Sequence, residues 1–138
     1  MQSNQELFHI ALDAASQSYS PYSHFRVGAA LLCDDGTVVL GTNVENRSFG
    51  LTICAERSAI VSAISSGKKK FHSIAIATPD SNYPVSPCGA CRQVLSEFLS
   101  PETAVIFGPR LENAVATTIG ALLPFDALHE LARSDKKA

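Results

Sequence analysis

The chain has 138 residues, of which 46% are hydrophobic and 17% charged, and its formal net charge is −2. This length predicts a single domain over residues 1–138, and the charge argues against a protein that holds a nucleic-acid backbone through many phosphate contacts. The sequence has neither the pattern of a signal peptide nor an apolar run long enough to span a membrane, so we expect a cytoplasmic protein with no membrane contact.

The first part of the chain predicts a helix and a hairpin. Apolar residues recur at helical spacing over residues 4–18, and Pro21 cannot continue the helix. An almost wholly apolar run at residues 26–33 predicts a buried strand. Asp34-Asp-Gly36 is typical of a hairpin turn, so residues 37–41 are predicted to form the return strand.

The rest of the chain predicts further helices and strands. The predicted helices cover residues 54–66, 88–99 and 125–133, and the predicted strands cover residues 73–78, 104–107 and 114–119. Together with the first helix and the hairpin, the order becomes αββαβαββα. We therefore predict an α/β protein, a three-layer α/β/α sandwich with a five-stranded mixed sheet.

A polar segment from Asn43 to Gly50 follows the predicted hairpin and leads directly to Cys54. Its composition predicts a surface loop. Loops held by rigid elements often carry recognition groups. Because this loop precedes a candidate metal ligand, a substrate-binding role is favoured over a purely structural one.

Two short motifs carry the candidate chemistry. Cys54 is followed two residues later by Glu56, and Cys88 and Cys91 form a Cys-x-x-Cys pair. Cys54 and Cys88 fall at predicted helix starts, where free N–H groups and the helix dipole favour the thiolate form that binds metal. Three thiolates can hold one zinc ion and leave its fourth position to a water, whose proton the carboxylate of Glu56 can move.

Structural zinc sites are usually closed by four Cys or His ligands, whereas this sequence offers one Cys-x-x-Cys pair and a third Cys followed by an acid. The pattern therefore favours a catalytic zinc. Three thiolates would leave the site with a net charge of −1, so a nearby positive group is expected, and Arg57 and Arg92 are the candidates. Cys33 lacks a partner at metal spacing and is predicted to be a small buried apolar residue.

At these residues the sequence resembles the cytidine deaminase family, and in particular its short, homotetrameric branch. The zinc-deaminase signature of His or Cys, then Glu, then Pro-Cys-x-x-Cys is present. The matching stretches are Tyr22-Ser-His-Phe-Arg-Val-Gly-Ala-Ala-Leu-Leu32, Gly41-Thr-Asn-Val-Glu-Asn46, Cys54-Ala-Glu-Arg57, Ser86-Pro-Cys-Gly-Ala-Cys-Arg-Gln93 and Leu122-Leu-Pro124. The resemblance covers most of the chain from about residue 19 to residue 124. The resemblance implies one zinc per chain, Glu56 as the proton-transfer residue and hydrolytic release of ammonia from a cytosine ring, as in pyrimidine salvage.

The resemblance also implies how the nucleoside is bound. Phe25 would pack against the pyrimidine, and Asn43 and Glu45 would hold the ribose hydroxyls. Backbone groups of Ala55 and Ser86 would contact the base. The implied substrates are cytidine and 2′-deoxycytidine.

Two further aromatic residues belong to the implied site. Phe49 would face the active site of a neighbouring subunit in the homotetramer. Family members usually have a spacer between Leu-Leu-Pro and a Phe that closes the pocket, whereas here Phe125 follows Pro124 directly. The resemblance therefore leaves open whether Phe125 closes the pocket or has no lid role.

Three other functions compete with this interpretation. A deaminase of another aminopyrimidine, such as an antibiotic nucleoside, would share the metal motifs and lack the Asn43-Val-Glu-Asn46 pattern. A non-catalytic zinc module would leave Glu56 without a role. An enzyme that edits nucleic acid would need basic and aromatic binding surfaces, but the basic run is Lys68 to Lys70 alone and the aromatic fraction is 7%.

Overall fold

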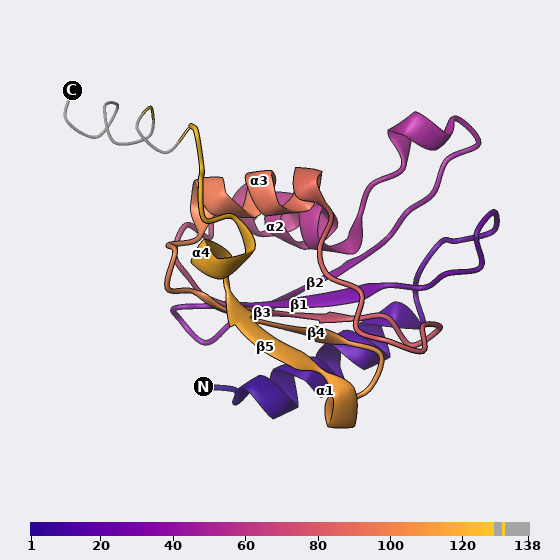
Figure 1. Ribbon diagram of the computed structural model, residues 1–138, viewed down its shortest axis with the longest axis horizontal. Helices are drawn as coiled ribbons and strands as arrows, with labels where there is room; N and C mark the ends of the chain where they lie inside the picture. The colour runs from indigo at the N-terminus through magenta and orange to yellow at the C-terminus, as the bar shows by residue number, and fades with distance from the viewer. Residues whose placement is uncertain (129–130, 132–138) are drawn as a thin grey trace.

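A mixed sheet forms the centre of the computed structural model, which describes residues 1–128 and 131 (Figure 1). Its strands are β1 (Gly28–Cys33), β2 (Val38–Thr42), β3 (Phe71–Ala77), β4 (Ala104–Gly108) and β5 (Val115–Thr118). They lie in the order β2-β1-β3-β4-β5. Strands β3 and β4 are parallel and the other neighbours are antiparallel, as expected for a mixed sheet.

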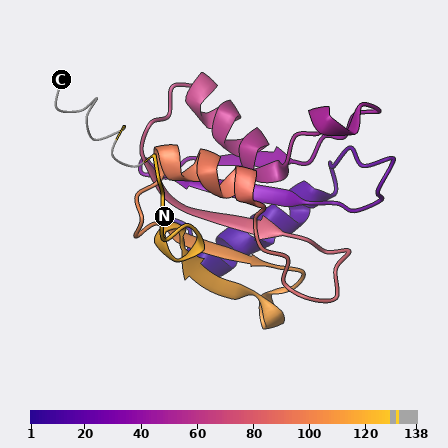
Figure 2. The ribbon, with the colours of Figure 1, turned by 45° about the horizontal axis from the view of Figure 1, so that its top comes forward.

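Helices cover both faces of this sheet. They are α1 (Asn4–Ala15), α2 (Ala55–Ser65), α3 (Gly89–Phe98) and α4 (Ile119–Leu122), with short 3₁₀ turns η1 (Phe49–Leu51) and η2 (Leu111–Asn113). Helix α1 lies on one face, and α2 and α3 lie side by side on the other (Figures 1 and 2). The predicted α/β/α sandwich is therefore confirmed. None of the helices in this described part of the chain has the length and apolar character of a transmembrane span.

The two hydrophobic cores explain why the central strand β1 has no polar residue. All six residues of β1 are buried. Ala29 and Leu31 pack under α2 and α3, while Ala30 and Leu32 pack against α1. Burying one Leu side chain contributes about 1.5–3 kcal/mol, so both faces of this strand stabilise the fold.

Two glycines allow the helices to approach the sheet closely. A Cβ atom at Gly28 would lie 2.1 Å from the Ala11 carbonyl oxygen of α1. A Cβ atom at Gly41 would lie 2.3 Å from the Ala55 carbonyl oxygen and 2.5 Å from the Ala59 nitrogen of α2. The N-terminal turn of α2 is thus seated directly on β2.

Element ends differ from the prediction where side chains bind the backbone. Helix α1 ends at Ala15 because the Ser16 hydroxyl donates to the Asp13 carbonyl at 2.7 Å. Strand β5 ends at Thr118, whose hydroxyl accepts from the Ala121 N–H at 3.2 Å and starts α4, so the predicted strand at Ile119 is wrong.

The predicted C-terminal helix does not begin at Phe125. Residues 125–128 form a bend and a turn in the structure. Residues 129, 130, 132 and 133 of that predicted helix lie outside the described residues. The prediction of a helix is therefore wrong for residues 125–128.

Candidate metal centre and pocket

Three cysteine thiols converge where α2 and α3 begin. Cys54 is the N-cap of α2, Cys88 is the N-cap of α3, and Cys91 lies in the first turn of α3. Their Sγ atoms lie within 4.8 Å of one another, and those of Cys88 and Cys91 are 3.4 Å apart. A tetrahedral zinc with Zn–S bonds of about 2.3 Å needs its sulfurs roughly 3.8 Å apart, so this donor set fits zinc.

The thiols influence one another's protonation. A hydrogen bond from the Cys91 thiol, together with the Arg57 guanidinium, lowers the pKa of Cys54 to about 5. As the donor in that hydrogen bond, and because it is buried, Cys91 has its pKa raised. Cys54 therefore holds a thiolate most readily, and metal binding would release the remaining thiol protons.

The two arginines next to the motifs have different partners. Arg57 lies beside the metal centre, with its Nη2 atom 3.5 Å from Cys54 Sγ. Arg92 donates to the carbonyl oxygens of Pro87 at 2.7 Å and Leu122 at 2.8 Å, and to Ser86 Oγ at 2.9 Å. Arg57 thus brings positive charge to the sulfurs, whereas Arg92 ties the loop before Cys88 to α4.

Glu56 is buried next to the thiols, with 5% of its surface exposed. Burial raises the pKa of its carboxyl group to about 7, and the negative charge of Cys54 acts in the same direction. A carboxyl group with such a pKa both accepts and donates a proton near neutral pH.

A pocket of about 200 Å³ opens onto Glu56 and two of the three thiols. Its walls come from the loop before β1, the end of β2, the start of α2, the end of β3 and the loop before α3. The lining residues are Phe25, Val27, Asn43, Thr52, Cys54, Ala55, Glu56, Ile76, Thr78, Val85, Ser86 and Cys88.

Residues 1–108 match the family model described as the cytidine and deoxycytidylate deaminase zinc-binding region. The chain belongs to this family. A cytidine deaminase from Halalkalibacterium halodurans is 46% identical over 120 residues, which are 87% of this chain and 90% of the relative.

Solved structures and a second kind of relative also match this deaminase-family chain. The crystal structure of cytidine deaminase from Burkholderia pseudomallei is 41% identical, with a TM-score of 0.85 over 90% of this chain and 98% of that chain. A blasticidin-S deaminase from Bacillus cereus is 34% identical over 130 residues, which are 89% of this chain and 91% of the relative. The similarity thus covers most of the length of each relative.

Several residues assigned from the family resemblance line the same pocket. Phe25, Asn43, Ala55 and Ser86 lie there with Glu56, Cys54 and Cys88. The amide of Asn43 is already engaged: its Oδ1 accepts from the Ser18 hydroxyl and from the Val27 N–H at 2.9 Å. Its Nδ2 donates to the Phe25 carbonyl at 2.7 Å. Asn43 therefore shapes the pocket wall, and its contact with ribose stays a prediction.

Glu45 lies outside the pocket lining and binds the neighbouring turn. Its Oε1 accepts from the N–H groups of Tyr22 at 3.0 Å and Ser23 at 3.2 Å, and its Oε2 accepts from Ser23 Oγ at 2.5 Å. The Ser23 hydroxyl thereby lowers the pKa of Glu45. A carboxylate can accept about four hydrogen bonds, so one position remains for a ligand hydroxyl.

Neither of the two remaining aromatic candidates belongs to the pocket lining of this chain. Phe49 is 73% exposed and packs edge-on against Tyr22, with ring centroids 5.7 Å apart. Phe125 is 92% exposed. A single chain therefore brings neither ring to the pocket, and both assignments stay predictions.

Some residues of the pocket lining were not predicted from the sequence. Val27 and Ile76 lie in apolar runs that resemble core strands, so no pattern separates them from core residues. Thr78 ends the predicted strand at residues 73–78, and Val85 lies in the loop between that strand and the predicted helix at residues 88–99. The position of that loop directly before Cys88 was the available signal.

Proposed function

We propose that this chain is a single-domain, zinc-dependent cytidine deaminase. It converts cytidine and 2′-deoxycytidine with water to the corresponding uridines and ammonia, as a step of pyrimidine salvage in the cytoplasm. The observation that carries the proposal is the buried Glu56 carboxyl beside three thiols at the wall of a pocket that also contains Phe25. Reduced thiols suit the cytoplasm, where disulfides are rare.

The chemistry divides between the metal and the chain. Held by Cys54, Cys88 and Cys91, zinc would supply the Lewis acidity that makes a water nucleophilic near neutral pH. Glu56 takes a proton from the attacking water, gives a proton to N3 of the ring and later helps the amine leave as ammonia. Phe25 packs against the pyrimidine ring and keeps bulk water from it.

The positive charge of Arg57 supports this division. Three thiolates give zinc more negative charge than neutral His ligands would, which weakens its effect on the pKa of a bound water. The Arg57 guanidinium, 3.5 Å from Cys54 Sγ, withdraws part of that negative charge. Hydrogen bonds from outside a metal's ligands tune the metal in this way.

Cytidine turnover followed by absorbance tests the proposal directly. The zinc-loaded protein should release ammonia from cytidine, a chelator should stop the reaction, and added zinc should restore it. The panel should include an aminopyrimidine antibiotic nucleoside, because one relative is named blasticidin-S deaminase. A preference for that substrate over cytidine would replace the proposed function by the alternative one.

We expect Glu45→Gln to lower kcat/KM for cytidine by about 10- to 100-fold, as for a lost hydrogen bond to a charged group. The same carboxylate near the 3′ side would repel a following phosphate, so cytidine 3′-monophosphate and a cytosine-containing single strand should react poorly. Rates are compared by ammonia release.

Ser23→Ala is the comparison for Glu45→Gln. It removes a hydroxyl that donates to Glu45 Oε2 and accepts from the Phe25 N–H, and it leaves the carboxylate in place. Ser23→Ala should lose less kcat/KM than Glu45→Gln, and an unchanged kcat/KM in Glu45→Gln would assign Glu45 to the turn alone. Comparable turnover of the single strand would favour an editing enzyme.

The protein should also assemble as a homotetramer with D₂ symmetry, the usual closed arrangement for four identical chains. The loops of residues 18–27 and 43–53 project together beyond the sheet (Figure 1) and are joined by pairing of Val44 with Tyr19 and Ile53. They expose the large apolar side chains of Tyr19, Tyr22, Val44, Phe49, Leu51 and Ile53. Such a surface suits burial against another copy.

Light scattering measures this assembly, and Phe49→Asp should dissociate it and lower turnover. Val61→Asp provides the comparison, because Val61 is exposed on α2 and belongs to neither of these loops. A fully active monomer at working concentration would contradict the shared-site arrangement.

A further inference from the structure

The wall of the pocket that carries Phe25 is held by hydrogen bonds to Ser23 in the same loop and to Asn43 from another segment. The Phe25 N–H donates to Ser23 Oγ at 3.0 Å, and the Phe25 carbonyl accepts from Asn43 Nδ2 at 2.7 Å. The Val27 N–H donates to Asn43 Oδ1 at 2.9 Å. The backbone just before β1 is thus fixed without a regular strand partner for residue 25, and the Phe25 ring depends on these contacts for its position.

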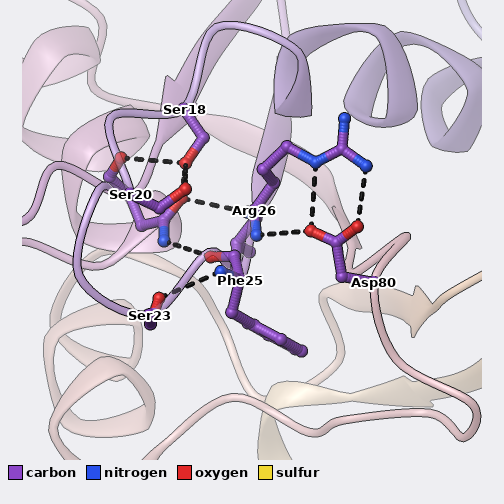
Figure 3. Close-up of polar contacts among 8 residues, drawn as sticks. Ser18, Ser20, Ser23, Phe25, Arg26 and Asp80 are labelled. Atoms are coloured by element: carbon purple, nitrogen blue, oxygen red, sulfur yellow. Dashed lines mark hydrogen bonds and ion pairs between the residues drawn. The ribbon is translucent and has the colours of Figure 1, made fainter.

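Between these two residues, Arg26 is bound to Asp80 by three hydrogen bonds. Asp80 Oδ2 accepts from the Arg26 backbone N–H at 2.8 Å and from its Nε at 3.0 Å. Asp80 Oδ1 accepts from Arg26 Nη2 at 2.7 Å, which completes a bidentate ion pair (Figure 3). The Asp80 carboxylate therefore accepts hydrogen bonds from both the side chain and the backbone of Arg26, the residue next to Phe25.

Asp80 belongs to the second loop that borders the pocket. This loop follows β3, begins at Thr78 and reaches Val85 and Ser86, all three of which line the pocket. The Ser81 N–H donates to the Thr78 carbonyl at 3.0 Å, so Asp80 lies within a closed turn. The ion pair therefore ties the loop that carries Phe25 to the loop that forms another part of the same wall.

We propose that Arg26 and Asp80 are a positioning pair that sets substrate affinity by holding Phe25 in the pocket wall. Neither residue lines the pocket, so both act through Phe25. The readout of this inference, nucleoside turnover, rests on the proposed function. A ring that packs against the pyrimidine equally before and during reaction affects KM and leaves kcat unchanged.

The solvent exposure of the Arg26–Asp80 ion pair predicts that it contributes little to the free energy of unfolding. The Arg26 and Asp80 side chains are 49% and 26% exposed, and ion pairs in such positions stabilise proteins only slightly. Removing the pair should therefore shift the melting temperature by no more than about 3 °C. An effect on KM without a comparable effect on stability identifies positioning.

The test compares Arg26→Ala, Asp80→Ala and the double variant as zinc-loaded proteins. Each should raise KM for cytidine by about 3- to 10-fold with kcat within about twofold of the parent. The double variant should match the more severe single variant, because both remove one shared interaction. Asp80→Asn keeps an oxygen acceptor for the Arg26 N–H and should lie between parent and Asp80→Ala.

A second ion pair supplies the matched control. Lys68 Nζ lies 2.8 Å from Asp35 Oδ2, with side chains 30% and 53% exposed, and neither residue lines the pocket. Asp35→Ala should leave KM unchanged. The dependence of KM on salt concentration gives an independent test. In about 1 M NaCl the screening length is roughly 3 Å, so the ion pair is weakened and KM of the parent should rise toward that of Asp80→Ala.

The outcomes separate the inference from the proposed function. A parent that turns over cytidine together with unchanged KM in Arg26→Ala and Asp80→Ala overturns the positioning role alone. So do variants that lose zinc or that lower kcat and the melting temperature together, because these results indicate a structural role. A zinc-loaded parent without nucleoside turnover overturns both the proposed function and the inference.

Discussion

Glu56→Gln should lower kcat for cytidine by about 10²–10⁴, the usual contribution of general acid–base catalysis. The amide has nearly the same shape as the carboxyl group and cannot carry a proton between water, ring and amine. Because Glu56 is buried, removal of its charge should not destabilise the fold. We therefore expect the variant to keep its zinc and its melting temperature. Steady-state kinetics, elemental analysis and thermal unfolding measure the three quantities.

Glu97→Gln is the control for this experiment. Glu97 lies on α3 and is exposed, so the same chemical change there should leave kcat unaltered. Near-normal turnover in zinc-loaded Glu56→Gln would remove Glu56 from the mechanism. Loss of zinc together with turnover would make its role structural.

Cys88→Ala should lose both zinc and measurable turnover. It removes one of three sulfurs and also the N-cap acceptor for the Cys91 N–H. A ligand present at 1,000 times its Kd stabilises the protein that binds it by about 4 kcal/mol. A chelator should therefore lower the melting temperature of the parent and leave that of Cys88→Ala unchanged.

Cys33→Ala tests whether the effect belongs to the three converging thiols. Cys33 is buried in β1, and burial raises the pKa of its thiol, which disfavours the form that binds metal. This variant should bind one zinc per chain and turn over cytidine. Loss of zinc from Cys33→Ala, or full zinc in Cys88→Ala, would show that the ligand set is wrong.

The sequence was sufficient for features that repeat along it or that occupy short motifs. The strands β1 and β3 are buried on both faces, so their residues form apolar runs that stand out from the surrounding sequence. Cys54 and Cys88 were predicted at helix starts, and the structure makes each of them an N-cap. Local spacing therefore predicted most of the sheet and the three cysteines whose thiols converge.

Contacts between distant side chains and backbone left no such pattern. Asp80 binds Arg26 across 54 residues of sequence, and Asn43 binds the backbone of residues 25 and 27. The backbone of residues 25–27 therefore binds side chains, and strand β1 begins at Gly28, although the apolar run predicted a strand from Arg26. Charged and amide side chains have many available partners on a surface, and their sequence positions do not specify which one is chosen.

Gly41 shows that a residue without a functional group can limit which substitutions this protein tolerates. It lies on β2, and any side chain there would collide with backbone atoms of Ala55 and Ala59. Ala55 lies between Cys54 and Glu56, so relief of that collision would move both of these side chains together. Mutational drift at position 41 is thus blocked by the site itself, and libraries that vary the sheet should leave this glycine fixed.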